Sequence, residues 1–167
     1  MDVRDRLARF PGRINFLGAL LCFGLVAVAV GLEHWQGLEP CPLCIFQRIA
    51  FVAMGVGLLI GTLMPGLVAM STVALGAIAG VGLAARHLWL QSLPADQVPA
   101  CGPGLSYLMD SLPLTRVLTQ VLAGSGECAQ VDYVLGLSIP LWTLAAFIVI
   151  GGVFIALNWM VRQRRLR

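Results

Sequence analysis

Charged side chains are scarce in this chain of 167 residues. Aspartate, glutamate, lysine and arginine together make up 11% of it, whereas apolar residues make up 59%. A water-soluble domain carries charge on about a quarter of its residues, because its surface must be hydrated. The composition therefore excludes an ordinary soluble domain and indicates a protein whose solvent is lipid.

Motifs for a bound redox cofactor are missing. The chain has neither the Gly-x-Gly-x-x-Gly of a dinucleotide site nor the Cys-x-x-Cys-His of haem attachment. Its two histidines, His34 and His87, do not stand at a metal-ligand spacing from a cysteine pair. We therefore expect no flavin, haem or metal ion, and any electron acceptor must come from outside the chain.

Long apolar runs, by contrast, are abundant. Four of them approach the ~20 residues that span a hydrocarbon core of ~30 Å. Because a backbone in lipid must satisfy its own hydrogen bonds, each run is expected to be a helix. We predict an all-α membrane protein, a single domain built as a bundle of four transmembrane helices. The predicted spans are residues 14–32, 44–64, 67–87 and 140–161.

The distribution of arginine predicts the topology. The chain has no lysine, and four arginines precede the first span while four follow the last. Basic residues collect on the cytoplasmic side of a membrane. The net charge of +3 therefore reflects topology and does not point to nucleic acid. The predicted cytoplasmic segments are 1–13, 65–66 and 162–167, and the predicted outer segments are 33–43 and 88–139.

The first apolar run could also be a cleaved signal peptide, with Ala27-Val28-Ala29 as the cleavage site. The run has 19 residues. The apolar region of a signal peptide has only roughly 7–15 residues. We therefore expect the first span to be retained.

Four of the five cysteines fall on the predicted outer side: Cys41, Cys44, Cys101 and Cys128. A compartment outside the cytosol permits disulfides. A zinc site is disfavoured because only the first pair has knuckle spacing, while the second pair stands 27 residues apart. The second pair suits a structural disulfide that closes a long loop. The first pair would close only a tiny loop, and such short pairs are more often redox centres.

The surroundings of the first pair favour a reactive thiolate. Pro42 favours the first position of a helix, which places Cys44 in the first turn. Exposed N–H groups and the helix dipole stabilise negative charge there. Arg48, four residues later, lies on the same face and adds a cation. An arginine at this position could instead only anchor the end of the span, but beside a Cys-x-x-Cys pair we favour the redox interpretation.

A dithiol at the boundary of lipid and water predicts a quinone as its oxidant. Thiol–disulfide exchange moves a disulfide but does not create one, so a two-electron acceptor is needed. A quinone headgroup needs hydrogen-bond donors or positive charge at its ring oxygens. Arg48 and His87 fall at the same outer end of adjacent antiparallel spans, and Arg86 is a weaker candidate. His87 could also be an ordinary interfacial histidine.

A short amphipathic helix is predicted in the second outer segment, and we expect its apolar face to lie at the membrane interface. The glycines that follow it lead to Cys128, and a Gly-Pro pair follows Cys101. This cysteine pair is therefore expected on a flexible loop that can meet a protein partner. The apolar positions of the helix are Leu114, Val117, Leu118, Val121 and Leu122.

Several segments in this order resemble the DsbB family, the disulfide bond formation proteins of bacterial inner membranes: "CPLCIFQR", "RHLWLQ", "ACGPG", "GSGECA" and "LGLSIPLW". With the hydropathy pattern the resemblance covers nearly the whole chain. It implies a multi-pass protein of the inner membrane with both termini cytoplasmic. It also implies a protein-disulfide:quinone oxidoreductase, with ubiquinone or menaquinone as acceptor.

The resemblance implies a role for each cysteine. Cys41–Cys44 would be the membrane-proximal disulfide, with Cys44 facing the quinone. Cys101–Cys128 would be the second disulfide, with Cys101 forming the mixed disulfide to a thioredoxin-like periplasmic partner, DsbA. A disulfide would pass from the first pair to the second and on to DsbA, while electrons run the other way. Cys22 matches no family site and is expected to be an incidental core cysteine.

The resemblance places Arg48 and His87 in the quinone site. Two other classes of protein stay open. One is a reductase of the vitamin K epoxide reductase kind, although there the Cys-x-x-Cys usually comes late in the core, whereas here it precedes the second span. The other is a non-catalytic membrane scaffold or small transporter with outer disulfides. A scaffold would consume no quinone, which separates it from the enzymes.

Overall fold

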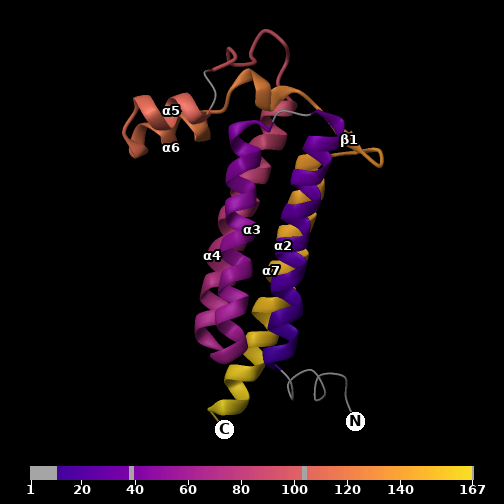
Figure 1. The fold of residues 1–167 in the computed structure, drawn as a ribbon, viewed down its shortest axis with the longest axis vertical. Helices are drawn as coiled ribbons and strands as arrows, with labels where there is room; N and C mark the ends of the chain where they lie inside the picture. The colour runs from indigo at the N-terminus through magenta and orange to yellow at the C-terminus, as the bar shows by residue number, and fades with distance from the viewer. Residues whose placement is uncertain (1–10, 38–39, 103–104, 167) are drawn as a thin grey trace.

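Four long antiparallel helices form the body of the molecule in the computed structural model, which describes residues 11–37, 40–102 and 105–166 (Figure 1). All four are long and apolar enough to cross a membrane. The prediction of an all-α, four-helix membrane protein is confirmed, and the chain is a multi-pass membrane protein. The four are α2 (Pro11–Gln36), α3 (Pro42–Leu63), α4 (Leu67–Gln91) and α7 (Ile139–Arg165).

The helices and the apolar runs that predicted them differ at their ends. The helix α2 extends its run at both ends, α4 continues to Gln91, and α3 begins two residues before its run and ends one residue before the run does. The positions at which the chain enters and leaves the bilayer stay predictions, because helix ends and membrane boundaries need not coincide. Much of the charge used for the topology, Arg4, Arg6, Arg9, Glu39 and Arg167, lies outside the described residues.

Small residues let the helices approach one another closely. Gly57 of α3 packs against Thr72 of α4, and Gly80 of α4 packs against the ring of Phe147 on α7. The tight turn between α3 and α4 needs Gly66, whose φ of +119° disfavours a residue with a side chain. Phe147 in turn stacks on Phe51 with ring centroids 3.9 Å apart. The bundle is thus held by packing, as expected where lipid supplies no hydrophobic drive between helices.

A buried amide pair closes the end of the bundle opposite the cysteines. Asn15 of α2 and Asn158 of α7 bond each other at 3.0 and 3.2 Å. Asn15 also donates to the carbonyl of Gly61, and Asn158 accepts from the amide of Gly66. The pair therefore ties α2 and α7 to the turn between α3 and α4.

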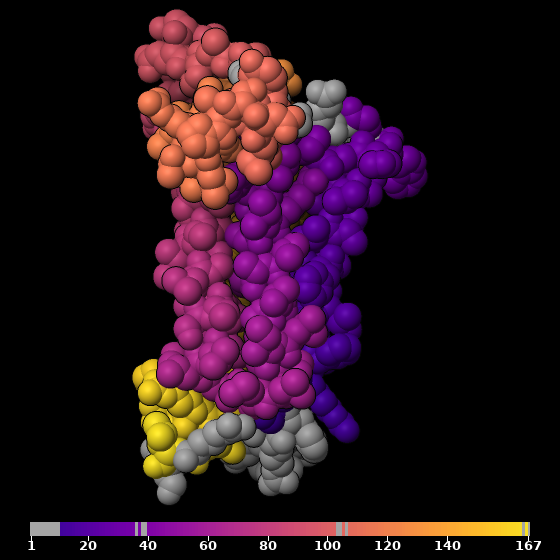
Figure 2. Space-filling view, turned by 60° about the vertical axis from the view of Figure 1, so that its left-hand side comes forward, coloured from indigo at the N-terminus to yellow at the C-terminus, as the bar shows by residue number. Residues whose placement is uncertain are grey.

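The segment between α4 and α7 caps the other end of the bundle. The amphipathic helix expected over 114–122 is confirmed as α6 (Leu114–Ala123). A short α5 (Leu105–Ser111), a 3₁₀ turn η1 (Gly126–Ala129) and a hairpin of β1 (Tyr133–Val134) and β2 (Leu137–Ser138) were not expected. Figure 2 shows α5 and α6 overhanging the ends of α3 and α4.

Candidate functional site

A pair of thiols marks the start of α3. Cys41 lies in extended backbone immediately before the helix, and Cys44 lies in the first turn behind Pro42. The two sulfurs are 3.3 Å apart and both are free thiols. Cys41 is buried and Cys44 half-buried. The predicted placement of a dithiol at a helix N-terminus is therefore confirmed as geometry, and helix N-termini favour thiolates.

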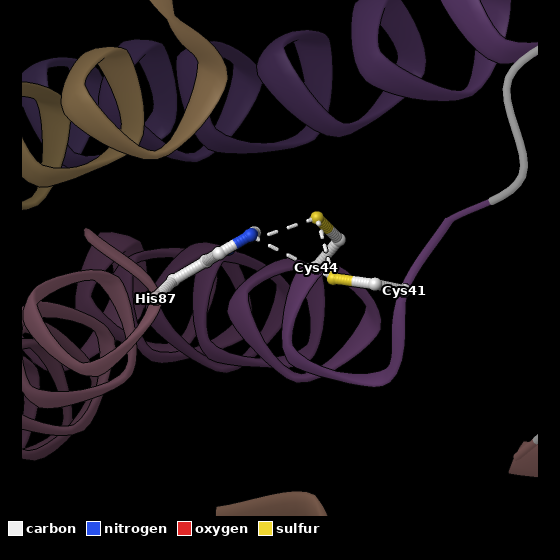
Figure 3. A group of neighbouring side chains, drawn as sticks. All are labelled: Cys41, Cys44 and His87. Carbon is white, nitrogen blue, oxygen red and sulfur yellow. Dashed lines mark hydrogen bonds between the residues drawn. The ribbon is translucent and has the colours of Figure 1, made fainter. Parts of the chain in front are cut away.

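His87 of α4 points at both sulfurs (Figure 3). Its Nε2 lies 3.8 Å from Cys41 Sγ, and its Nδ1 lies 3.9 Å from Cys44 Sγ. The imidazole is almost fully buried, at 3% exposure. One ligand atom from each of the three residues lies within 4.8 Å of the others, close enough for one metal ion. Sequence spacing could not reveal this proximity, because it arises from contact between two helices.

Gln47 and Thr143 complete a polar network that the sequence analysis missed. Gln47 of α3 is 2% exposed. Its Nε2 lies 3.3 Å from His87 Nδ1, and its Oε1 accepts a hydrogen bond of 2.7 Å from the Thr143 hydroxyl of α7. Three helices therefore meet at one amide behind the thiol pair. A buried amide keeps its place only when its polar atoms are paired, and here both ends are.

Arg48 pairs with an acidic residue that the sequence analysis did not single out. Both terminal guanidinium nitrogens donate to the carboxylate of Glu33, in the last turns of α2. The pair bridges α2 and α3, and both side chains are mostly shielded from solvent. Bidentate arginine–carboxylate pairs have a fixed geometry. The cation near Cys44 is therefore fixed in place by its ion pair with Glu33.

Cys128 lies beside the first thiol pair. It is fully buried on η1 and packs in one cluster with Cys41 and Leu43. The pKa of the Cys128 thiol is raised above its ordinary value, first by its hydrogen bond to Cys41, then by burial, and then by negative charge on Cys41. Cys128 is therefore a protonated thiol in contact with the start of α3.

Cys101 differs from Cys128 in its exposure. It is exposed and lies on an irregular segment that borders η1, where the amide of Gly126 donates to the carbonyl of Ala100 at 3.3 Å. A methyl group on Gly126 would come within 3.1 Å of Cys101 Sγ. The two segments that carry Cys101 and Cys128 thus run side by side, with one cysteine facing outward and the other facing the bundle.

Two pockets meet at Cys44. A mostly apolar pocket of about 470 Å³ lies between α2, α3 and α7, and its few polar walls include Glu33, Arg48 and Gln47. A more polar pocket of about 370 Å³ lies on the side of the capping segment and includes Cys41 and His87. Cys44 lines both. His87 lines the polar pocket and not the apolar one, and its predicted place in a quinone site stays a prediction.

Two other residues considered from the sequence lie away from this centre. Arg86 points along α4 to the capping segment, where it donates to the carbonyls of Leu122 and Ala123 and stacks over Trp89 at 4.1 Å. Cys22 is fully buried in the apolar core of the bundle. It fits the expected role of an incidental core cysteine.

Known proteins resemble this chain in sequence over most of its length. A family model described as disulfide bond formation protein DsbB matches residues 11–157. Disulfide bond formation protein B of Acinetobacter baylyi is 53% identical over 139 residues, 78% of this chain and 81% of the relative. The protein of the same name from Hahella chejuensis is 50% identical over 157 residues, 90% and 94% of the two chains. The chain therefore belongs to the DsbB family, membrane oxidoreductases that form disulfide bonds.

Proposed function

We propose that this protein generates disulfides by passing two electrons from a reduced thioredoxin-fold partner to a membrane quinone. The observation that carries the proposal is the position of Cys44 between two different pockets. One face of the thiol pair meets an apolar space suited to a ring that arrives from lipid. The other meets a polar space that contains Cys41 and lies next to Cys128.

The apolar pocket fits a quinone in size and chemistry. Its volume of about 470 Å³ lies in the range of small-molecule sites. Its walls are mostly aliphatic and aromatic, and Arg48 and Gln47 supply hydrogen-bond donors beside Cys44. Either ubiquinone or menaquinone has the two ring oxygens that such donors would hold.

The four outer cysteines would form two resting disulfides, Cys41–Cys44 and Cys101–Cys128. The 3.3 Å between the first two sulfurs supports the first pairing. The contact between the segments that carry these two cysteines, through the hydrogen bond from Gly126 to Ala100, supports the second. The exposed Cys101 would take the attack of a partner dithiol, since thiol–disulfide exchange requires access to the sulfur attacked.

Transfer between the pairs would run through the contact of Cys128 with Cys41. When a thiolate of the partner captures Cys101, Cys128 is released as a thiolate and attacks Cys41, and Cys44 leaves as a thiolate beside the apolar pocket. A second attack by the partner's free thiol removes the partner as a disulfide. Cys101, left as a thiolate, then attacks Cys128, which re-forms Cys101–Cys128 and releases Cys41. The reduced Cys41–Cys44 dithiol gives two electrons and two protons to the quinone, which becomes the quinol, and the Cys41–Cys44 disulfide closes again.

The partner and the cellular location follow from the family. We propose a DsbA-like periplasmic protein as partner and the bacterial inner membrane as location, with both termini cytoplasmic. The side chain of Arg162 near the end of α7 supports this orientation, since cations favour the cytoplasmic face.

Quinone consumption by the purified full-length protein tests the proposal. Reduced DsbA-like protein, or dithiothreitol in its place, should reduce a short-chain ubiquinone analogue in a reaction that needs Cys41 and Cys44. A vitamin K epoxide reductase-like enzyme would also accept the epoxide of a quinone as its electron acceptor, which a second assay with the epoxide measures. A scaffold would consume no quinone, and that result would overturn the proposal.

A further inference from the structure

Gln47 occupies a position that neither the cysteine motif nor the family description explains. Its side chain is buried at 2% exposure near the middle of the site. It lines the apolar pocket beside Cys44 and Arg48, and it also contacts His87 on the side of the polar pocket. Among the described residues, Gln47 thus connects the apolar pocket to His87, whose imidazole lies beside both sulfurs.

The hydrogen bonds of Gln47 leave one donor uncommitted. Its Oε1 accepts from Thr143 at 2.7 Å, which turns the amide nitrogen toward His87. That nitrogen carries two hydrogens, and one of them serves His87 Nδ1 at 3.3 Å. Buried amide hydrogens are normally paired, so the second hydrogen calls for an acceptor within the pocket that Gln47 lines.

Arg48 lines the same pocket as a charged donor. Each of its terminal nitrogens gives one hydrogen to Glu33, and the other guanidinium N–H groups take no part in that ion pair. His87 does not line the apolar pocket, and its Nδ1 already faces Gln47 and Cys44. An oxygen of a ring that sits against Cys44 therefore has Gln47 as an uncharged donor close at hand.

We propose that Gln47 is a quinone-binding residue, whose free amide hydrogen donates to a ring carbonyl oxygen in the apolar pocket. Thr143 is the positioning residue that fixes the amide in the required orientation. His87 belongs to the sulfur pair rather than to the ring. The inference rests on the proposed function only for the identity of the ligand. It assigns Gln47 to the quinone ring and His87 to the two sulfurs.

Quinone binding can be measured without turnover through tryptophan fluorescence. Trp142 lines the same apolar pocket, so a bound quinone should quench it. Purified full-length protein in detergent is titrated with a short-chain ubiquinone analogue, and Trp142→Phe identifies the part of the quench that reports on the pocket. The dissociation constant is compared for wild type, Gln47→Met, Thr143→Val and His87→Ala.

Gln47→Met should weaken quinone binding about five- to tenfold, the range expected for the loss of one neutral hydrogen bond. Thr143→Val, a smaller change, should weaken it about two- to threefold, because the amide then loses its fixed orientation. His87→Ala should leave the constant within about twofold of wild type while it slows turnover. Gln120→Met on the exposed face of α6 is the matched control and should have no effect.

Two results with the variants would overturn the assignment of Gln47. In one, Gln47→Met binds quinone as tightly as wild type, which would confine Gln47 to supporting His87. In the other, His87→Ala weakens binding as much as Gln47→Met, which would place both side chains on the ring. If wild type binds quinone but does not turn over, the proposed function fails while the comparison of variants still stands. If wild type binds no quinone, both proposals fail.

Discussion

The two cysteines of the capping segment should react at different rates, because their surroundings differ. Cys101 is exposed, whereas Cys128 is fully buried with a raised pKa. Only the thiolate is alkylated. In the fully reduced protein, iodoacetamide should therefore modify Cys101 first. Cys128 should stay protected as the pH rises through the ordinary thiol range of about 8.5 and become reactive only above it.

Peptide mapping by mass spectrometry between about pH 7 and 10 measures this difference. A raised folded-state pKa also means that the protonated thiol stabilises the fold. That contribution is fully present below the unfolded-state pKa and is lost as the pH rises through the folded-state value. Alkylation in denaturant is the control, where the two thiols should react alike. Equal rates in the folded protein near pH 8 would contradict the assigned burial of Cys128.

Removal of the Arg48 cation should weaken quinone use and spare the protein partner. Arg48→Ala should raise the KM for quinone about tenfold or more, the cost expected for losing a charged hydrogen-bond donor. The KM for the reduced partner should stay near that of wild type, because Arg48 lines only the apolar pocket. Steady-state kinetics with each substrate varied in turn measures both constants.

The substitution also leaves Glu33 without its partner, so a double variant is the needed control. Arg48→Ala with Glu33→Gln removes the stranded carboxylate as well as the cation. If the cation itself holds the quinone, the double variant should keep the high KM. Recovery of the wild-type KM would show instead that repulsion by Glu33 caused the defect.

Residues that act through one local motif could be predicted from the sequence, and residues that act across helices could not. The three-residue spacing of Cys41 and Cys44, with Arg48 about one helical turn after Cys44, indicated the dithiol and its cation. Glu33, Gln47 and Thr143 belong to three different helices, and nothing in their local sequence marks them as partners. Their roles depend on which faces of the helices meet.

Among the elements, the long apolar helices were predictable because lipid permits few alternatives. A run of about 20 apolar residues in a bilayer has to be a helix. The capping segment is different, because its short elements lie near both water and lipid, and neither environment dictates one secondary structure. The β1–β2 hairpin turns through Leu135 and Gly136, both at positive φ, and its few residues gave no periodicity to detect. The helix α5, with 7 residues, is similarly short.

Arg86 should determine how firmly α6 is attached to the bundle. Its guanidinium donates to two carbonyls at the C-terminal end of α6, a position where a cation also complements the helix dipole. Arg86→Met should therefore increase hydrogen exchange in α6, measured by mass spectrometry. Arg116→Met, on an exposed position of α6, is the control and should leave exchange unchanged. Unchanged exchange in Arg86→Met would mean that apolar packing of Val117 and Val121 alone holds the helix.

For the whole molecule, the proposed function implies that the arrangement of the bundle keeps two kinds of substrate apart. The apolar pocket opens among helices that face lipid, whereas Cys101 faces outward on the capping segment. The buried Cys128 and Cys41 connect the two sides. A water-soluble protein and a lipid-soluble ring can therefore exchange electrons without meeting.

Cys22 has no place on this route, and Cys22→Ser should leave turnover nearly unchanged.

This separation can be made visible by stopping the route at Cys44. In Cys41→Ala, Cys44 has no mate with which to close a disulfide, but it still lines the apolar pocket. A thiolate that persists beside an electron-poor ring gives a charge-transfer absorption in the visible range. The quinone-loaded variant should therefore be coloured. The measurement is its visible spectrum against that of wild type loaded with the same quinone.

The requirements for the colour distinguish the two cysteine pairs. A second substitution of Cys44→Ala or Arg48→Ala should abolish the band, because the first removes the thiolate and the second removes the cation that favours it. Cys101→Ala should leave the band intact, since Cys101 lies on the exposed segment away from the apolar pocket. A band that survives the loss of Cys44, or disappears with Cys101, would reverse the assignment of the pairs. The quinone would then have to reach the thiols of the capping segment, which the position of Cys44 between the two pockets argues against.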